Sequence, residues 1–407
     1  MICRHCRSRL TDVFLDLGRT PPSNAYLSEA ALSEPETAYP LRVFVCNHCR
    51  LVQTEDYADA DELFSPHYAY FSSTTKSWLD HAACYAAMIS ERFALSDESF
   101  VIEVASNDGY LLRNFVDAAI PCLGIEPTDS TAAAAEALGI PVLRKFFGEA
   151  LGRELAERGR RADLVCGNNV YAHVPDINDF TRGLAAVLKP EGVVTLEFPH
   201  LLRLIEQCQF DTVYHEHFSY LSLAVVERIF AAAGLRLFDV EELPTHGGSL
   251  RVYGCLAAAG HSTSPAVAEV LAAERRHGLD TDAPYAAFQS RADAVRDGLL
   301  SFLHDAKRTG KTVAGYGAAA KGNTLLNYAR VTRDLLPFIC DAAPSKQGLF
   351  MPGSHIPILP PSALFDRRPD FVLILPWNIA AEARAQLEPL AAAGTRFVTA
   401  VPTLTVF

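Results

Sequence analysis

The segment YHEHFSY at residues 214–220 gathers groups that exchange protons, with two histidines and a glutamate set among tyrosines. It follows the predicted strand VVTLEF. In an extended segment successive side chains face opposite sides, so Tyr214 and Glu216 would share one side. His215 and His217 would then share the other. This alternation argues against a single flat catalytic face formed by the segment alone. The role of the segment therefore depends on the elements that hold it.

Two identical cysteine pairs predict a zinc site. Each pair has the spacing Cys-x-x-Cys, and the four residues are Cys3, Cys6, Cys46 and Cys49. Four thiolates suit tetrahedral Zn²⁺, and a site closed by four protein ligands stabilises a domain rather than catalysing a reaction. His5 and His48 are alternative ligands, and free surface thiols are the other interpretation. We expect metal removal to unfold the first ~60 residues more than it slows the chemistry.

Short β-branched segments alternate with alanine- and leucine-rich segments from residue 100 onward, which predicts an α/β fold with a parallel sheet. The expected strands are FVIEVAS at 100–106, CLGIEP at 122–127, ADLVCGNN at 162–169 and VVTLEFP at 193–199. A further helix and closing strands follow. Ligands of such sheets bind beyond the carboxyl ends of the strands, which directs attention to the loops SNDG, EPT, GNNVYAH and FPH.

The first of these loops favours a nucleoside without a phosphate. A pyrophosphate needs several glycine amides, whereas this loop offers only Gly109, and Asp108 repels anions. S-adenosylmethionine fits better, because Asp108 can face its amino group or a bound water. Glu126, about 20 residues beyond the first strand, can accept hydrogen bonds from its ribose. An ordinary α/β turn is the alternative. The residues expected to bind the cofactor are Glu103, Ser106, Asp108, Gly109, Glu126, Asn168 and Asn169.

A second strand, turn and helix pattern begins near residue 311 and predicts a smaller open-sheet domain, with a late helix at 382–393. The turn GYGAAAKG at 315–322 places glycines and Lys321 at a helix N-terminus, which suits a diphosphate. It departs from Gly-x-Gly-x-x-Gly at the third glycine. Glycines that only allow close packing of strand and helix are the alternative.

Composition excludes several classes of protein. A chain of 407 residues is too long for one hydrophobic core, so two or three domains are expected. A formal net charge of -12 without a basic run argues against binding to nucleic acid or anionic lipid. The N-terminus lacks the apolar core of a signal peptide, and no segment has the apolar length that a bilayer requires. Ten cysteines are too sparse for a disulfide scaffold. We expect a cytoplasmic protein, a monomer or small homo-oligomer.

The order of the motifs resembles that of the three-domain sugar C-methyltransferases, which act on nucleotide-linked ketosugars in deoxysugar biosynthesis. The motifs are CRHC and CNHC, HYAYFSS, EVASNDGYLL, GNNVYAHVPDINDF, EFPHLL, YHEHFSYLS, HGGSLRVY, GYGAAAKGNTLLNY and DAAPSKQGLFMPGSHIPI. The resemblance implies a zinc-binding domain, a central Rossmann-like methyltransferase domain that binds S-adenosylmethionine, and a smaller Rossmann-like α/β domain that helps to hold the nucleotide-sugar. We expect these domains at 1–65, 66–258 and 311–407, with a helical connector at 259–310.

The resemblance also implies catalytic roles. In the family the segment Tyr-x-Glu-His supplies the base and its neighbours. The catalytic residues carried over to this chain are Tyr214, Glu216, His217, His173 and Tyr68. His215 competes with His217 as the base, and Tyr70 is the alternative to Tyr68.

The implied reaction is C-methylation, at C3, of a 4-keto-deoxysugar linked to a nucleoside diphosphate, expected to be dTDP. Removal of a proton beside the ketone forms an enolate, and histidine is a suitable base near neutral pH. Tyrosine and histidine donors can stabilise the enolate oxygen. The residues assigned to the substrate are Tyr70, His200, His246, Arg251, Gly315, Gly317, Lys321, Asn323, Asp341 and Lys346.

Three other functions compete with this interpretation. Methylation of oxygen or nitrogen needs a base but no enolate partner. A nicotinamide-dependent sugar oxidoreductase would use GYGAAAKG for its cofactor, although the third glycine of the usual motif is missing. A zinc-ribbon scaffold that binds nucleotides without turnover would leave YHEHF as a packing feature.

Overall fold

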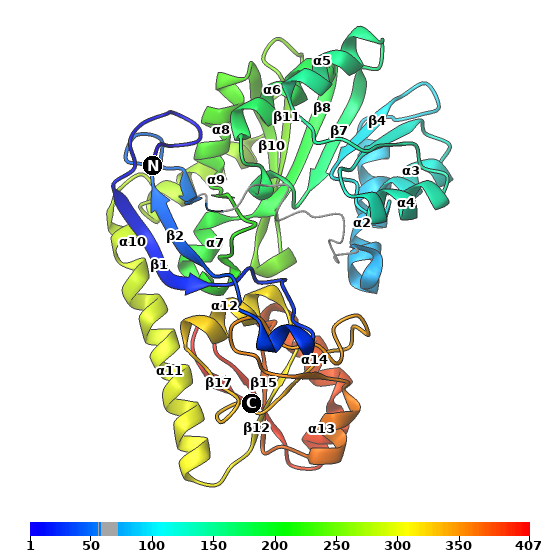
Figure 1. The fold of residues 1–407 in the computed structure, drawn as a ribbon. Helices are drawn as coiled ribbons and strands as arrows, with labels where there is room; N and C mark the ends of the chain where they lie inside the picture. The colour runs from blue at the N-terminus through cyan, green and yellow to red at the C-terminus, as the bar shows by residue number, and fades with distance from the viewer. Residues whose placement is uncertain (56, 58–71) are drawn as a thin grey trace.

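The computed structural model describes residues 1–55, 57 and 72–407, which form three sheets flanked by helices (Figure 1). The N-terminal strands lie beside both larger sheets, and the long helix α11 (Phe288–Arg308) runs along one side of the molecule. The predicted α/β class with three such parts is confirmed. The domain boundaries given above stay predictions. No helix in the described part of the chain is long and apolar enough to cross a membrane.

The N-terminal sheet is antiparallel and takes its last strand from the middle of the chain. Its order is β1-β2-β3-β9, and its strands are β1 (Asp12–Thr20), β2 (Tyr39–Val45), β3 (Val52–Thr54) and β9 (Ser219–Tyr220). The short 3₁₀ helix η1 (Ala30–Ser33) lies between β1 and β2. Val52 pairs with Tyr220 and Gln53 with Ser219. Because β9 follows YHEHF directly, the N-terminal sheet holds one end of that segment.

The central sheet is parallel over β4 to β8 and is closed by the antiparallel strands β10 and β11. Its order is β10-β11-β8-β7-β4-β5-β6. The strands are β4 (Val101–Val104), β5 (Cys122–Ile125), β6 (Val142–Leu143), β7 (Ala162–Asn168), β8 (Leu188–Pro199), β10 (Leu235–Leu243) and β11 (Ser249–Leu256). Strands such as β4 and β5 are buried along their whole length, as expected for a sheet covered on both faces.

Helices connect these strands, and capping residues set where some of them begin. The Asp176 carboxylate accepts a hydrogen bond from the Asp179 N–H at the start of α6, and Ser222 caps α8 in the same way. The elements are η2 (Ser72–Thr74), α2 (Lys76–Arg92), α3 (Leu112–Asp117), α4 (Asp129–Ala137), α5 (Glu149–Glu157), η3 (Tyr171–His173), α6 (Ile177–Val187), α7 (Leu201–Glu206), η4 (Phe210–Thr212), α8 (Leu223–Ala232), η5 (Thr245–Gly247) and α9 (Pro265–Arg276).

The C-terminal sheet has the order β14-β13-β12-β15-β16-β17 and is parallel except for β17. Its elements, with the preceding short helix, are α10 (Ala283–Ala286), β12 (Val313–Tyr316), α12 (Ala320–Tyr328), β13 (Ile339–Cys340), β14 (Ile358–Leu359), α13 (Ser362–Arg367), β15 (Phe371–Ile374), η6 (Trp377–Ile379), α14 (Ala380–Gln386), α15 (Glu388–Ala392), β16 (Arg396–Thr399) and β17 (Thr405–Val406). The single helix predicted at 382–393 is wrong. The chain breaks at Leu387, because Pro389 lacks an N–H and starts a new helix within its first turn.

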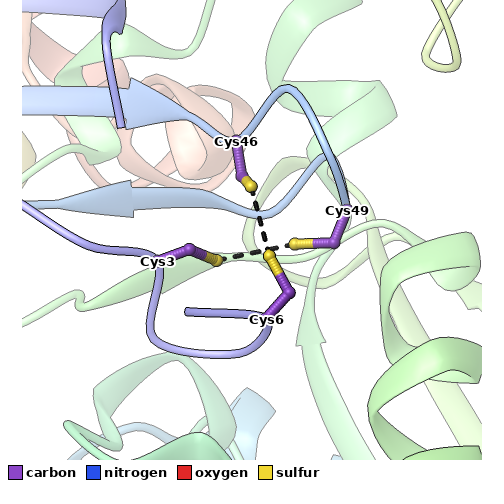
Figure 2. Close-up of side chains that lie close together, drawn as sticks. All are labelled: Cys3, Cys6, Cys46 and Cys49. Atoms are coloured by element: carbon purple, nitrogen blue, oxygen red, sulfur yellow. Dashed lines mark hydrogen bonds between the residues drawn. The ribbon is translucent and has the colours of Figure 1, made fainter. Parts of the chain in front are cut away.

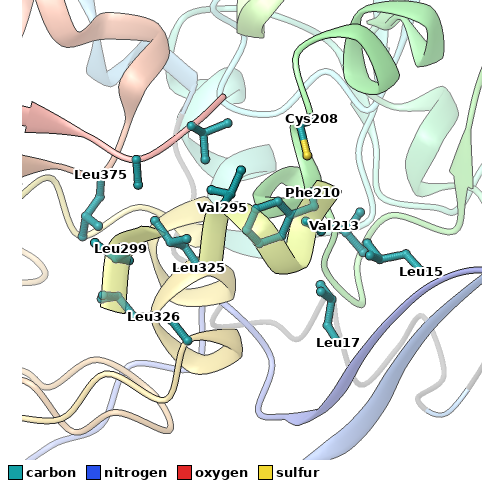
Figure 3. Packing of buried hydrophobic residues seen from close by; sticks show 14 of the residues in the cluster. Leu15, Leu17, Cys208, Phe210, Val213, Val295, Leu299, Leu325, Leu326 and Leu375 are labelled. Carbon is teal, nitrogen blue, oxygen red and sulfur yellow. The ribbon is translucent and has the colours of Figure 1, made fainter. Parts of the chain in front are cut away.

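One hydrophobic cluster joins the three parts of the molecule (Figure 3). The cluster includes Leu15 of β1, Phe210 beside YHEHF, Leu299 of α11, Leu325 of α12 and Leu375 after β15. Each such side chain contributes about 1.5–3 kcal/mol when fully buried. Separating the parts would expose many of them at once, so the junction that carries YHEHF is held from three sides.

Candidate active site

The predicted cofactor residues gather where the strand order of the central sheet reverses, beyond the carboxyl ends of β4, β5 and β7. Glu103 lies in β4, Glu126 follows β5 and Asn168 ends β7. The two carboxylate oxygens of Glu126 each accept a backbone hydrogen bond, from the N–H of Asn107 at 2.9 Å and of Thr128 at 2.9 Å. These bonds tie the loop after β4 to the end of β5 and leave lone pairs for a ribose hydroxyl.

The charge at this edge of the sheet fits a cation. Burial raises the pKa of Glu103 well above its usual value, and the carboxylates of Glu126 and Asp108 raise it further. Ser106 Oγ and Asp108 Oδ1 are buried without a hydrogen-bond partner among the described residues. A ligand with a positive charge and several donors would satisfy these groups, which are the properties expected of S-adenosylmethionine.

Gly109 lets the loop after β4 turn back toward helix α4. Its φ is +79°, a left-handed conformation that disfavours other residues. An added Cβ would also lie 2.4 Å from Ile140 Cδ1. The chain of η2 covers this loop, because the N–H groups of Ser72 and Ser73 donate to the side chains of Asn107 and Asp108. The loop after β4 is therefore held between α4 on one side and η2 on the other.

The segment YHEHF forms a turn rather than an extended strand. The His217 N–H donates to the Tyr214 carbonyl at 3.0 Å, and the two rings lie with centroids 4.0 Å apart. The predicted alternation of side chains is therefore wrong, because a turn returns residues three apart to the same side. His173, from η3 at the end of β7, completes the group with its ring 4.6 Å from that of His217.

His217 is buried, and a backbone carbonyl sets its tautomer. Nδ1 lies 3.1 Å from the carbonyl oxygen of Thr212, which only accepts, so Nδ1 carries the proton and Nε2 the lone pair. Burial lowers the pKa of His217 well below its usual value, and the nearby His173, His246 and Lys321 lower it further. Burial also lowers the pKa of His173 to about 4, against a raising hydrogen bond to the Glu216 backbone.

His215 points away from this group. Its Nε2 donates to the carbonyl of Pro40 at 3.2 Å, and its ring meets the edge of Tyr39 at 5.9 Å between centroids. Both residues belong to β2 in the N-terminal sheet. The turn thus places the two histidines of the segment in different surroundings, one facing the N-terminal sheet and one facing His173 and Tyr214.

The four predicted metal ligands form one cluster at the N-terminus (Figure 2). The thiols of Cys3 and Cys6 and those of Cys46 and Cys49 point toward one another from two loops, with all four sulfur atoms within 4.8 Å. Cys3 lies 3.5 Å from Cys49 and Cys6 lies 3.5 Å from Cys46, sulfur to sulfur. Such separations suit one tetrahedral Zn²⁺ with Zn–S bonds of about 2.3 Å. The imidazole of His5 instead contacts Asn178 at 2.8 Å.

Two lysines lie at the predicted diphosphate turn between β12 and α12. Lys321 is part of the turn, and Lys346 contacts it from a later loop. Lys346 donates to the carbonyl of Ala318 at 2.8 Å, and Asp341 accepts the N–H of Ala318 at 2.7 Å. Lys321 donates to Asn378 at 2.6 Å and lies 4.8 Å from the centroid of the Trp377 ring. Burial lowers the pKa of both lysines, while Asp211 and Asp341 act against this.

Comparison with known proteins decides the family. C-methyltransferase NovU of Streptomyces niveus is 36% identical to this chain over 403 residues, which cover 98% of this chain and 95% of that protein. The chain belongs to the C-methyltransferase family. Models of a zinc binding domain, a methyltransferase domain and a C-methyltransferase C-terminal domain match residues 3–64, 78–240 and 244–402. This C-methyltransferase therefore uses S-adenosylmethionine and carries a structural zinc site, as predicted.

Two solved methyltransferases each resemble about half of this C-methyltransferase. The 1,6-didemethyltoxoflavin-N1-methyltransferase of Burkholderia thailandensis, with bound substrate and S-adenosylhomocysteine, is 15% identical with a TM-score of 0.38, covering 51% of this chain and 96% of that one. A S-adenosylmethionine-dependent methyltransferase of Clostridium acetobutylicum is 10% identical with a TM-score of 0.36, covering 44% and 92%.

Three residues assigned to the substrate have close contacts within the C-methyltransferase itself. A Cβ on Gly315 would lie 2.6 Å from Ile339, and one on Gly317 would lie 2.4 Å from Pro376. Asn323 is fully buried and donates to the Ser23 carbonyl at 2.5 Å. Both glycines therefore allow close packing at this turn, and their assignment to the substrate stays a prediction.

Two other assigned residues, Arg251 and His200, have partners within the protein. Arg251 is buried and pairs with Glu197 at 3.0 Å and with Glu241 at 3.1 Å, so its charge is already compensated. His200 donates to the buried carboxylate of Glu274 at 2.8 Å. A buried charge requires such a partner within the protein, and the assignment of these two residues to the substrate stays a prediction. Tyr68 and Tyr70 lie outside the described residues.

His246 contacts residues at the cofactor edge of the central sheet. Its Nε2 accepts a hydrogen bond from the Asn169 amide at 3.0 Å, and its ring lies 5.3 Å from that of Trp78. Burial and, next, the nearby Lys321 lower the pKa of His246 to about 4. The imidazole is therefore neutral at pH 7, which favours a hydrogen-bonding role over charge pairing with a phosphate.

Sequence reasoning missed several residues of this region. Glu197 is fully buried in β8, where it accepts from His81 at 2.9 Å and from Thr245 at 3.0 Å, and so supports the loop of His246. A charged residue inside the apolar strand VVTLEFP was the available signal. Asn24, in the loop between β1 and β2, donates to the Glu216 carboxylate. These two residues are 192 positions apart, and a single sequence carries no signal for such a contact.

Replacing Glu126 with glutamine is expected to weaken binding of S-adenosylmethionine by this C-methyltransferase roughly tenfold to a hundredfold. Glutamine has one acceptor oxygen, so it can serve only one of the N–H groups of Asn107 and Thr128. Leaving the other N–H unpaired costs about 1–3 kcal/mol. Calorimetric titration measures the effect. Glu136→Gln, on the exposed side of α4, is the control, and an unchanged affinity for Glu126→Gln would rule out the ribose-binding role.

Proposed function

We propose that this C-methyltransferase methylates C3 of a 4-keto-deoxysugar linked to a nucleoside diphosphate, with dTDP as the carrier, through an enolate formed by His217. The proposal rests on one observation. His217, which is buried, presents an Nε2 lone pair beside the half-buried Tyr214 and His173, because its Nδ1 proton is held by the Thr212 carbonyl. An imidazole kept neutral beside two potential hydrogen-bond donors has the properties needed to remove a proton next to a ketone.

The C-terminal domain supports a nucleoside diphosphate as the carrier. Two half-buried lysines lie at the N-terminal turn of α12: Lys321 is part of that turn, and Lys346 donates to the Ala318 carbonyl just before it. Burial lowers the pKa of both. An anion at this turn would compensate both lysines and would also meet the N-terminal dipole of the helix. The same helix contacts the segment before YHEHF, because Thr324 donates to the Val213 carbonyl at 2.9 Å. A sugar attached to such a diphosphate can therefore reach toward His217.

The chain's own groups can carry the chemistry in the following way. Nε2 of His217 takes the proton from the sugar carbon, and the electron pair of that C–H bond moves onto the ketone oxygen. Tyr214 and His173 stabilise this oxyanion, while Glu216 accepts a sugar hydroxyl. S-adenosylmethionine supplies a methyl group already activated on sulfur, and the sugar carbon gains it as the sulfur–carbon bond breaks. Alignment of the two carbons contributes up to about 7–11 kcal/mol.

Exchange with deuterated water tests this proposal. Incubation of the enzyme with a panel of ketosugar nucleotides in deuterated water should place deuterium on the carbon next to the ketone, detected by mass spectrometry. Addition of S-adenosylmethionine should convert the same compound into a product heavier by one methyl group. Methyl transfer to oxygen or nitrogen without any carbon exchange would instead favour the runner-up reaction.

The pH dependence follows from the lowered pKa of His217. The base acts when unprotonated, so activity should be constant from about pH 6.5 to 8 and decline only below the ordinary histidine value of about 6.5. Because the unfolded chain binds this proton more readily than the folded one, stability should also fall as pH drops below about 6.5. Profiles of kcat/KM and of denaturant unfolding measure the two effects. An acid limb above pH 7 would contradict the assignment.

A further inference from the structure

The loop at 21–27, which leaves the N-terminal sheet after β1, reaches the proposed reaction centre. Nδ2 of Asn24 donates to both carboxylate oxygens of Glu216, at 3.0 Å and 3.2 Å. The Glu216 side chain is buried, with 4% of its surface exposed, whereas Asn24 is exposed. An exposed amide thus meets a buried carboxylate at the boundary between solvent and the turn YHEHF.

Contacts with the C-terminal domain hold the loop on both sides of Asn24. Before it, the Ser23 carbonyl accepts the amide of Asn323 at 2.5 Å. After it, the Tyr26 hydroxyl donates to the Ala318 carbonyl at 2.6 Å. Leu27 then exchanges two backbone hydrogen bonds with Phe350, at 3.0 Å and 2.8 Å. Four hydrogen bonds to the C-terminal domain therefore hold the segment that places Asn24 against Glu216.

Different contacts set the positions of the His217 and Glu216 side chains. His217 is oriented by the carbonyl of Thr212, and its position does not depend on the Glu216 side chain. The carboxylate of Glu216 instead meets the loop between β1 and β2, which also contacts the C-terminal domain. A two-oxygen contact with one amide restricts rotation of the carboxylate and favours its charged form.

We propose that Asn24, supplied by the zinc-binding domain, is a positioning residue that sets the orientation and charge of Glu216. The inference rests on the proposed function, in which Glu216 accepts a hydroxyl of the sugar. It assigns to the N-terminal domain a part in the reaction besides binding zinc. The groups that face Glu216 include Tyr26 and His173, and Tyr26 has its pKa raised by burial and by the charges of Asp341 and Glu216.

Two substitutions at Asn24 and one control test this inference on the full-length, zinc-loaded enzyme. Asn24→Ala removes the amide and should lower kcat about 10- to 100-fold, the range of a hydrogen bond to a charged group, with unchanged affinity for S-adenosylmethionine. Asn24→Asp keeps the size but opposes two carboxylates, which then share a proton. The activity of the Asn24→Asp variant should be lowest at acidic and neutral pH and should recover as pH rises. The pH below which activity declines should therefore be higher than in the wild-type enzyme by about one unit or more.

The control is Glu36→Gln, which alters another contact of the same domain with the C-terminal domain. Glu36 accepts from the Gly353 N–H at 2.9 Å and from His355 at 2.8 Å, and neither touches the turn. Its kcat and pH profile should match those of the unaltered enzyme. Wild-type profiles in both Asn24 variants would overturn the inference, while carbon exchange by the wild-type enzyme would still uphold the proposed function. Absence of exchange with every ketosugar would refute the proposed function itself.

Discussion

Replacement of His217 with asparagine is expected to abolish both carbon exchange and methyl transfer, with a loss of about 10²–10⁴ in kcat. The side-chain amide of asparagine can still donate to the Thr212 carbonyl, so the turn with Tyr214 should persist. It offers no basic nitrogen, however, and the sugar carbon keeps its proton. Binding of S-adenosylmethionine should be nearly unchanged, because its expected contacts lie at the ends of β4, β5 and β7.

The matched control is His215→Asn, which changes the same residue type two positions earlier. His215 contacts Pro40 and Tyr39 of the N-terminal sheet, so its loss should affect stability more than exchange. Deuterium incorporation, methyl transfer and calorimetric binding of S-adenosylmethionine should be measured on both variants. Retained exchange in the His217 variant would move the role of the base to His215 or Tyr214.

Removal of zinc is expected to abolish turnover as well as the fold of the N-terminal domain. In structural zinc sites the binding energy, about 10–16 kcal/mol in isolated zinc-finger peptides, is folding energy. The sequence alone predicted mainly a loss of folding. In the structure, β3 pairs with β9 directly after YHEHF, and Thr54 donates to the His217 carbonyl at 2.9 Å. Unfolding of this domain should therefore release the turn YHEHF, with a loss of activity greater than about a hundredfold if the turn has its proposed role.

Chelation of zinc and the substitution Cys46→Ser are two ways to remove the metal and unfold the N-terminal domain. The control is Cys84→Ser, at an exposed cysteine outside the cluster. Limited proteolysis of the N-terminal residues and the rate of methyl transfer should be followed together. Both should change with the same dependence on residual zinc. A chelator that stopped turnover while the N-terminal domain remained folded would contradict a purely structural metal.

The predictable parts of this protein were those set by local pattern. Identical spacing of Cys3/Cys6 and Cys46/Cys49 identified the metal cluster, because the ligands of a closed zinc site occur in close pairs. The central strands were found from their apolar runs, and the structure places Glu126 directly after β5 as the pattern predicted, while its role toward the cofactor stays a prediction. Local pattern misled where a turn replaced an extended segment, as in YHEHF, and where Pro389 divided a helix.

The sequence by itself determined the residue types and the order of the elements: a cysteine cluster, a parallel sheet with an acidic cofactor edge, and a turn rich in histidine. Only the tertiary structure decided which histidine faces the site and which faces β2, because the i to i+3 turn and the pairing of β3 with β9 set their directions. It also decided that Asn24 meets Glu216 and that Arg251 is compensated by Glu197. Such contacts join residues far apart in the chain, and their energy depends on burial that no local segment possesses before the domains pack together.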